Sequence, residues 1–346
     1  MAVAIAREIE IQKEYLGPSG LQTIYFGGGT PSLLNKAELD LIINSIHKNF
    51  TVDAQAEITL EANPDDLNFE KLTQLTQSGI NRLSIGTQSF HEPHLKYLNR
   101  AHHSEEAVNS VKMAQDIGIT NISIDLIYAI PALDHSTLVS DIAQLSSLNI
   151  PHVSAYSLTI EPQTVFGNWL KKNKIKPIDD EFSAQQFEIL VASLATLGYE
   201  QYEISNFAVN QQYSRHNSSY WQSRPYLGVG PSAHSYNKET RSYTISNNGL
   251  YLKAIAKNEI PATTEILTTA NKTNEYLLTG LRTKWGVSLE TLSQLSGDTF
   301  MKYSSHALKS LQKEGLILLK EQTVLLTSKG KLFADRIASD LFLDDE

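Results

Sequence analysis

Three neighbouring glycines interrupt an apolar run in "YFGGGTPSLL", residues 25–34. Because glycine has no Cβ, the backbone of Gly28 and Gly29 can approach a ligand group that a side chain would push away, and Thr30 adds a hydroxyl. The same residues also suit a flexible turn between a strand and a helix, with Pro31 fixing φ before the helix. The run fits neither G-x-G-x-x-G nor the P-loop pattern, so it gives little support to a dinucleotide or nucleoside triphosphate site.

Polar side chains recur where other apolar runs end. Glu61 and Gln88 follow such runs, Asp125 lies inside one, and Arg100 stands in "LNRAH". A carboxylate accepts hydrogen bonds from ribose hydroxyls or an ammonium group, an arginine can clamp a carboxylate, and an aspartate in an apolar strand is costly to bury without a partner. The alternatives are an ion pair of Glu61 with Arg82 or Arg100, and a solvated surface position for Arg100.

The elements that must position these residues follow a repeating strand and helix pattern. The strand-like runs are Thr23–Phe26, Glu57–Leu60, Arg82–Gly86, Asn121–Ile127 and His152–Leu158. The helix-like stretches are Lys36–Asn49, Asn68–Ser78, Ser104–Ile117 and Leu133–Leu148. This alternation predicts right-handed βαβ units and a parallel sheet. Because such barrels build their sites at the carboxyl ends of the strands, we expect a shared pocket there rather than isolated turns and caps.

The pattern changes after residue 179. A helix is predicted over 180–197, and residues 199–270 are rich in Tyr, Asn and Ser without clear periodicity, which indicates a loop-rich segment that covers a ligand. Helical periodicity then returns, followed by the alternating pair "LILLKEQTVLLT" and a final helix "SKGKLFADRIASDLF", an order that resembles a winged helix. We therefore divide the chain into a barrel over 1–198, a covering segment over 199–270 and a small domain over 271–346.

Composition narrows the classes of function. The formal net charge is −9, and residues 272–346 carry ten basic and ten acidic side chains, unlike the basic surface of a nucleic-acid reader. We expect no transmembrane segment, no signal peptide and a cytoplasmic location. The chain has no cysteine, which excludes disulfides and thiolate metal sites within it, and its ten histidines form no helical metal-binding pair.

Taken in order, "YFGGGTPSLL", "EITLEANPDDL", "RLSIGTQSF", "LNRAH", "IDLIYAIP", "YEISNFA", "RHNSSYW" and "LGVGPSAHSY" resemble the radical S-adenosylmethionine (radical SAM) enzymes of the oxygen-independent coproporphyrinogen III oxidase family, with the strongest likeness to its HemW-type haem chaperones. The resemblance implies an α/β fold, a partial (β/α)6 TIM-like barrel with a winged-helix-like C-terminal module. It also implies S-adenosylmethionine and a 4Fe-4S cluster as the family's cofactors. The S-adenosylmethionine contacts carried over by the resemblance are Gly28, Gly29, Thr30, Glu61, Gln88, Arg100 and Asp125.

The segment "HNSSYW", residues 216–221, matches a motif associated with haem binding in the chaperone branch. The resemblance makes His216 the iron ligand, and Tyr220 and Trp221 could pack on a porphyrin face. The alternative is an ordinary hydrogen-bonded loop histidine. His234, in "PSAHSY", is a second and weaker ligand candidate.

The family also carries a C-x3-C-x2-C motif that holds the cluster, and this sequence has no counterpart to it. The sequence aligns from the helix that follows that motif, so we expect the first barrel strand and the cysteines to be missing through a truncation or a mis-assigned gene start. The strand near Thr23 would then lie at a sheet edge. Because S-adenosylmethionine cleavage needs an electron from the cluster, we expect this form to be inactive as a radical enzyme.

The resulting hypothesis is a HemW-like chaperone that binds haem and S-adenosylmethionine and delivers haem to recipient haemoproteins. Two alternatives stay open. One is an oxygen-independent coproporphyrinogen III oxidase (dehydrogenase) of porphyrin biosynthesis that forms protoporphyrinogen IX. The other is a cofactor-free haem-binding scaffold.

Overall fold

A computed structural model describes residues 1–344. The chain divides into two compact units. The barrel unit comprises residues 25–33 and 58–213, and the terminal unit comprises residues 1–24, 34–57 and 214–346.

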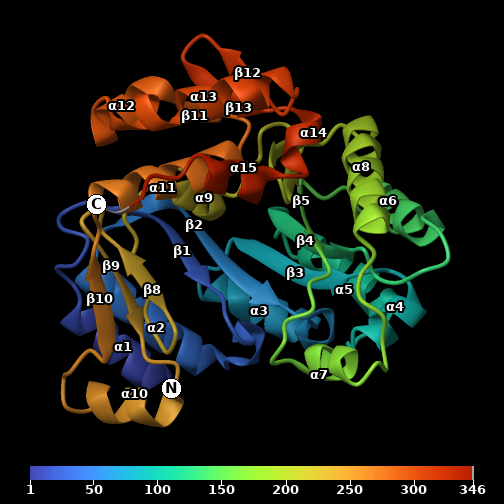
Figure 1. Ribbon diagram of the computed structural model, residues 1–346. Helices are drawn as coiled ribbons and strands as arrows, with labels where there is room; N and C mark the ends of the chain where they lie inside the picture. The colour runs from blue at the N-terminus through green and yellow to red at the C-terminus, as the bar shows by residue number, and fades with distance from the viewer. Residues whose placement is uncertain (345–346) are drawn as a thin grey trace. The chain divides into compact units, whose positions relative to one another are not determined.

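The chain contains a seven-stranded sheet with the strand order β1-β2-β3-β4-β5-β7-β6; β1 to β5 are labelled in Figure 1. The strands are β1 Leu21–Phe26, β2 Val52–Ala62, β3 Arg82–Gln88, β4 Ile122–Tyr128, β5 His152–Ser157, β6 Glu200–Glu203 and β7 Asn206–Ala208. The pairs from β2 to β5 are parallel, whereas β7 pairs antiparallel with both β5 and β6. The predicted α/β class and parallel strands are confirmed, β1 ends the strand order as expected, and the antiparallel end is an addition.

Side-chain alternation gives the parallel strands two different faces. Leu83 and Ile85 on β3 and Ile124 on β4 are fully buried, and helices pack on these strands, α5 (Ser104–Asp116) on β3 and α8 (Asp180–Thr196) on β4. The intervening positions are polar: the register pairs Glu61 with Ser84 and Ser84 with Ser123. One face of the sheet is therefore an apolar core, and the other presents polar side chains in a row.

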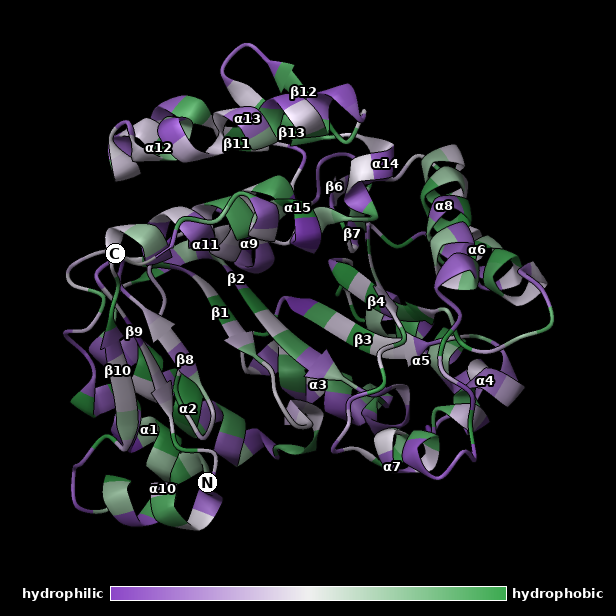
Figure 2. Cartoon of the chain, viewed as in Figure 1, coloured by the Kyte–Doolittle hydropathy of each residue, from purple (hydrophilic) through white to green (hydrophobic). Residues whose placement is uncertain are grey.

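Five of the helices between the strands confirm predicted helical stretches, whereas the short helices Glu92–Tyr97 and Val165–Lys171 were not predicted. They are α2 Lys36–Asn49, α3 Phe69–Gln77, α4 Glu92–Tyr97, α5, α6 Ser136–Leu148, α7 Val165–Lys171 and α8, with short 3-10 helices at Pro31–Leu33 and Pro64–Asp66. Asn35 and Glu38 form a reciprocal capping box that fixes the start of α2. Hydrophobic and hydrophilic residues alternate along these helices, as α8 shows in Figure 2.

The terminal unit contains two small antiparallel sheets and several helices. Its elements are α1 Ala2–Ile11, α2, α9 Arg215–Trp221, β8 His234–Tyr236, β9 Thr240–Thr244, α10 Asn248–Ile255, β10 Ala262–Ile266, α11 Thr269–Leu281, β11 Val287–Ser288, α12 Leu289–Ser296, α13 Thr299–Lys313, β12 Ile317–Lys320, β13 Thr323–Leu326, α14 Ser328–Lys331 and α15 Ala334–Asp340. The strand orders are β10-β9-β8 and β11-β13-β12. The predicted hairpin after the helices is confirmed as β12 and β13.

Residues 199–270 contain five short strands and two complete helices, each too short to give a periodic signal in the sequence. One prediction about the C-terminal part of the chain is wrong. The predicted final helix is two helices, α14 and α15. The break occurs where Leu332 and Phe333 donate to carbonyls three residues back rather than four, which tightens the turn and ends α14.

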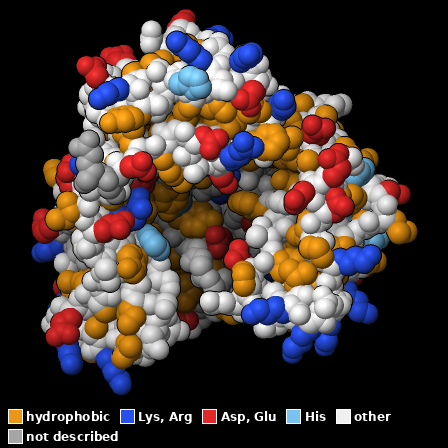
Figure 3. Space-filling model, in the orientation of Figure 1, with side chains coloured by type: hydrophobic (Ala, Val, Ile, Leu, Met, Phe, Trp, Pro, Cys, Tyr) orange, Lys and Arg blue, Asp and Glu red, His pale blue; other side chains and the backbone are white. Residues whose placement is uncertain are grey.

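Acidic and basic side chains are interspersed over the face of the molecule shown in Figure 3. No helix among residues 1–344 combines the length and the apolar character that crossing a bilayer requires.

Candidate functional site

The glycine run forms a tight cradle at the end of β1. A Cβ built on Gly27 would lie 2.5 Å from Cε1 of Tyr25 and 2.9 Å from Oε1 of Glu61, so only glycine fits there. Gly28 and Gly29 have φ values of +77° and +66°, and no heavy atom lies within 4 Å of a Cβ built on either. Gly27 is therefore required by space, and the next two glycines by backbone conformation. Their backbone faces open room.

The carboxylate of Glu61 closes this cradle from β2. It accepts hydrogen bonds from the hydroxyl of Tyr25 at 2.7 Å and from the backbone N–H of Gly28 at 3.2 Å. Burial and the nearby charge of Glu61 raise the pKa of the Tyr25 phenol, which therefore stays protonated as a donor. Glu61 thus fixes the glycine turn and keeps part of its acceptor capacity for another donor.

Asp125 lies on β4, on the polar face of the sheet. The hydroxyl of Ser84 lies 3.1 and 3.2 Å from its two carboxylate oxygens. Burial raises the pKa of Asp125 to about 7; the Ser84 hydrogen bond opposes this shift, the charge of Glu61 adds to it, and the charge of Arg82 opposes it. A ligand that donates hydrogen bonds to this carboxyl group would stabilise its charged form.

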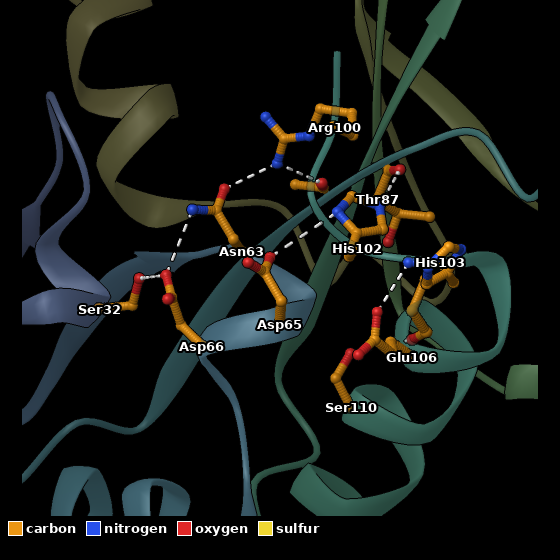
Figure 4. Close-up of polar contacts among 12 residues, drawn as sticks. Ser32, Asn63, Asp65, Asp66, Thr87, Arg100, His102, His103, Glu106 and Ser110 are labelled. Carbon is orange, nitrogen blue, oxygen red and sulfur yellow. Dashed lines mark hydrogen bonds and ion pairs between the residues drawn. The ribbon is translucent and has the colours of Figure 1, made fainter. Parts of the chain in front are cut away.

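The side chains of Arg100 and Gln88 both lie close to Gly86. Nη2 of Arg100 donates to Oδ1 of Asn63 at 2.7 Å and to the carbonyl of Gly86 at 3.1 Å (Figure 4). A Cβ on Gly86 would lie 3.0 Å from Nε2 of Gln88 and 3.4 Å from Nη2 of Arg100. Gln88 itself has φ +66°. Arg100 is partly buried, not solvated, and its Nε is buried with no hydrogen-bond partner.

Ser32 and Asp66, which extend the hydrogen-bond chain behind Arg100, were missed by sequence reasoning. Oδ2 of Asp66 accepts hydrogen bonds from Ser32 at 2.6 Å and from Nδ2 of Asn63 at 3.2 Å, so the Arg100 partner is itself held in place (Figure 4). The sequence signal was the run "NPDDL", which begins two residues after Glu61 and in which Asp66 follows Asn63 across one 3-10 turn. Asn63 therefore links Asp66 to the guanidinium of Arg100.

His102 is the other buried residue of this cluster. It is 2% exposed, and its Nε2 lies 3.1 Å from the carbonyl of Thr87. Its Nδ1 has no hydrogen-bond partner and lies 3.9 Å from Oδ1 of Asp65. Burial lowers the pKa of His102, so the ring is neutral at pH 7. Nothing in "LNRAH" marks this histidine as buried.

The haem-associated motif lies on helix α9 in the terminal unit. Nδ1 of His216 lies 2.9 Å from Oγ1 of Thr23, and Nε2 lies 2.8 Å from the hydroxyl of Tyr220. The alternative placed His216 in a loop, and this placement is wrong, because His216 is the second residue of a helix that Ser214 caps. Nε1 of Trp221 is buried with no hydrogen-bond partner.

A row of aromatic rings continues from His216. The rings of Tyr220 and Tyr226 are 4.8 Å apart at 88°, and those of Tyr226 and Tyr236 are 6.1 Å apart. Burial raises the pKa of Tyr220 to about 12, and Tyr226 adds to the shift, so both hydroxyls are protonated at neutral pH. His234, the weaker candidate, is exposed on β8 with its ring tilted against Tyr243 at 5.8 Å.

Comparison with known proteins identifies the family. Residues 3–145 match the Radical SAM superfamily, and residues 267–333 match the HemN C-terminal domain. The chain is 36% identical over 323 residues to the heme chaperone HemW of Bacillus subtilis, covering 93% of this chain and 85% of that protein. The chain belongs to the radical SAM family of HemW and HemN. It is also 34% identical to HemW of Lactococcus lactis, covering 94% of this chain and 86% of that protein.

A solved structure supports the same conclusion for the fold. Coproporphyrinogen III oxidase HemN from Escherichia coli, described as a radical SAM enzyme, aligns with a TM-score of 0.83 over 98% of this chain and 82% of that one, at 23% identity. The predicted partial barrel with a small C-terminal domain is therefore confirmed. At this identity the likeness concerns the fold alone.

The cradle residues of this radical SAM chain fit an S-adenosylmethionine ligand in their chemistry. The unpartnered Nε of Arg100 and the open, left-handed positions at Gly28 and Gly29 leave donors and room that a bound carboxylate and methionine chain would use. Asp125 and Glu61 supply acceptors for hydroxyl and ammonium groups.

The residues present do not fit a 4Fe-4S cluster. The sequence contains no cysteine, and residues 1–344 hold no group of three His, Asp or Glu side chains arranged to bind a metal ion. Iron–sulfur clusters in such proteins are held by thiolates. No step of radical chemistry is therefore derived for this chain.

Proposed function

We propose that this chain is a haem chaperone that binds haem through His216 and passes it to recipient haemoproteins. The observation that carries this proposal is the setting of His216: a histidine in the order H-N-x-x-Y-W, on helix α9, with one ring nitrogen held by Thr23. Metal-bound histidines generally have their second ring nitrogen held in this way. The relatives from Bacillus subtilis and Lactococcus lactis carry the name heme chaperone.

Aromatic side chains supply the rest of the haem contact. Tyr220 is 36% exposed, and its ring stands edge-on to that of His216 at 4.9 Å. Trp221 follows Tyr220 directly in the sequence and is partly exposed, so its indole could pack on a porphyrin face. The haem is cargo in this proposal, held by one imidazole and by aromatic packing.

S-adenosylmethionine is the proposed second ligand, bound in the barrel unit. Arg100 holds its carboxylate, Glu61 its ammonium group and Asp125 its ribose hydroxyls. The backbone of Gly28 and Gly29, with Thr30 and Gln88, lines the methionine chain. In radical SAM enzymes this cofactor is the source of the radical, which needs the cluster. The residues of this chain bind and orient the ligand only.

A haem-binding scaffold that works without S-adenosylmethionine is the second candidate. The observation in its favour is the lack of cluster ligands in the chain. Calorimetry of the wild-type chain with S-adenosylmethionine separates the two candidates. The scaffold would give no heat of binding with this ligand but would still bind haem.

Haem titration tests the leading proposal. The wild-type chain is expected to develop a shifted Soret band that saturates at one haem per chain. His216→Ala is expected to weaken binding by about 10-fold or more, since it removes the iron ligand. His306→Ala, at an exposed position on α13, is the matched control and should titrate like the wild type. A His216→Ala variant with an unchanged Soret spectrum and affinity would contradict the assignment. The loaded chain should then transfer haem to an apo-haemoprotein, and haem that never leaves the chain would refute the chaperone role.

A further inference from the structure

His216 is fixed at three separate atoms within the terminal unit. Its backbone N–H donates to Oε1 of Glu57 at 2.9 Å, its Nδ1 lies 2.9 Å from Oγ1 of Thr23, and its Nε2 lies 2.8 Å from the hydroxyl of Tyr220. Glu57 is 5% exposed, and its other oxygen accepts from the backbone N–H of Arg215 at 3.2 Å. The start of α9 is thus fastened to β2, so the imidazole has little freedom to turn.

Tyr220 owes its position to the helix. Residues four apart lie on one face of a helix, which places Tyr220 directly over His216. The ring centroids of His216 and Tyr220 are 4.9 Å apart, with an angle of 88° between the ring planes. The ring of Tyr220 also packs edge-on with that of Tyr226, with centroids 4.8 Å apart. The hydroxyl therefore occupies the space beside Nε2 where an iron atom would bind.

The two contacts on the ring are both made by hydroxyl groups, and they are compatible with the tautomer that binds iron through Nε2. A neutral imidazole carries one N–H and one lone pair. If Nδ1–H donates to Thr23, the lone pair lies on Nε2 and accepts the hydrogen bond of the Tyr220 hydroxyl. This is also the tautomer that can bind iron through Nε2. An N–H on Nε2 would leave no lone pair there for a metal.

We propose that Thr23 is a positioning residue that keeps the lone pair of His216 on Nε2, and that the Tyr220 hydroxyl is a displaceable cap on that atom. The inference rests on the proposed ligation of haem by His216. On binding, the hydrogen bond from Tyr220 to Nε2 breaks and an iron–nitrogen bond forms; the tyrosine keeps its proton, and nothing is oxidised or reduced. The cap slows both unwanted metal binding and haem entry, while the anchor strengthens the final bond.

Rapid-mixing measurement of haem binding to the full chain tests both roles. Tyr220→Phe keeps the ring but removes the hydroxyl, and it is expected to raise the association rate by about 2- to 10-fold, the range for one hydrogen bond. Thr23→Val has nearly the same shape without the hydroxyl, and it is expected to weaken haem affinity by about the same factor. Thr23→Ser restores a hydroxyl and should recover wild-type affinity. Tyr303→Phe, on the exposed face of α13, is the matched control.

A second measurement needs no haem. Nitrogen-15 NMR of histidine-labelled protein reports which ring nitrogen carries the proton. His216 is expected to show the Nδ1–H form in the wild type and a mixture of the two forms in Thr23→Val. Thermal unfolding of each variant shows whether the fold is retained.

The outcomes distinguish a failure of the roles given to Thr23 and Tyr220 from a failure of the proposed function. A His216→Ala variant that binds haem like the wild type overturns the proposed function. If His216→Ala abolishes binding while Tyr220→Phe and Thr23→Val keep wild-type rates and affinities, the inference alone is overturned. A wild-type His216 in the Nε2–H form would also overturn it.

Discussion

Two regions differ in how their polar atoms are hydrogen-bonded. One is the cradle, by which we mean the glycine turn at Gly28 together with Glu61, Arg100 and Asp125, and the other is helix α9, which carries His216. In the cradle, Nε of Arg100 is buried without a partner and burial raises the pKa of Asp125 to about 7. On α9, by contrast, both ring nitrogens of His216 lie within hydrogen-bond distance of a hydroxyl. The cradle therefore contains a buried donor atom, Nε of Arg100, that has no hydrogen-bond partner. On α9, by contrast, Nε2 of His216 already has a partner in the hydroxyl of Tyr220.

This difference has a consequence for how each site would bind. A buried polar atom without a partner costs about 1–3 kcal/mol, so a ligand that pairs with it recovers part of that cost. At His216 a ligand must instead displace Tyr220, and the net gain is the difference between two interactions. The cradle should respond to charge and pH, and α9 to the loss of single hydroxyls.

The largest expected effect comes from Asp125→Asn in the cradle. The folded pKa of about 7 lies above the unfolded value of 3.8, so the wild type loses stability as the pH rises from about 4 to about 7. Asn removes the charge, and at pH 8 the variant is expected to be more stable by roughly 2–4 kcal/mol, a gain that shrinks as the pH falls toward 4. Urea unfolding at several pH values measures this.

Asp134→Asn is the control for that experiment. Hydrogen bonds from Ser136 lower the pKa of the exposed Asp134, so its replacement should bring no gain at pH 8. A gain for Asp125→Asn that did not depend on pH, or a loss of stability at pH 8, would break the contrast between the two sites.

Arg100→Ala should have the next largest effect, on S-adenosylmethionine binding. Hydrogen bonds to charged groups contribute about 1.5–3 kcal/mol, so the affinity is expected to fall by roughly 10- to 100-fold in calorimetry. Haem titration of the same variant should be unchanged. Arg282→Ala, which removes a guanidinium paired with Asp335, is the control. Equal S-adenosylmethionine affinity in Arg100→Ala and the wild type would refute the cradle assignment.

Gly27→Ala tests the cradle by crowding. The added Cβ would lie 2.5 Å from the ring of Tyr25 and 2.9 Å from Glu61, so one of them must move, at an expected cost of roughly 1–2 kcal/mol in unfolding free energy. Gly20→Ala meets its nearest neighbour at an ordinary 3.6 Å and should stay within about 0.5 kcal/mol of the wild type. Equal stability of the two variants would show that Gly27 is not confined.

Much of the barrel could be predicted from sequence because its signals are long and repeated. The helix over Lys36–Asn49 matches the structure at both ends, since Asn35 and Glu38 mark its start and its apolar residues recur at helical spacing. The strands at Arg82 and His152 begin where the apolar runs begin. Asp125 was predicted as a site residue because an acid inside an apolar strand needs a partner, and the structure supplies Ser84. Glu61 was predicted as an acceptor at the end of a strand, and the hydroxyl of Tyr25 donates to it.

The remaining features depend on contacts that no local pattern records. The strands between residues 199 and 270 are three to five residues long, and their pairing is set by neighbours distant in sequence. The contact of Thr23 with His216 joins residues 193 positions apart. The burial of His102 likewise follows from the packing around Thr87, which the order of residues in "LNRAH" does not express.

The most direct test of the account is the identity of the iron ligand in the haem complex. Resonance Raman spectroscopy of the reduced complex should show an iron–histidine stretching band in the wild-type chain. The band should be lost in His216→Ala and regained when free imidazole is added to that variant. An iron–histidine band that persists in His216→Ala without imidazole would show that another histidine binds the iron and would contradict the central claim.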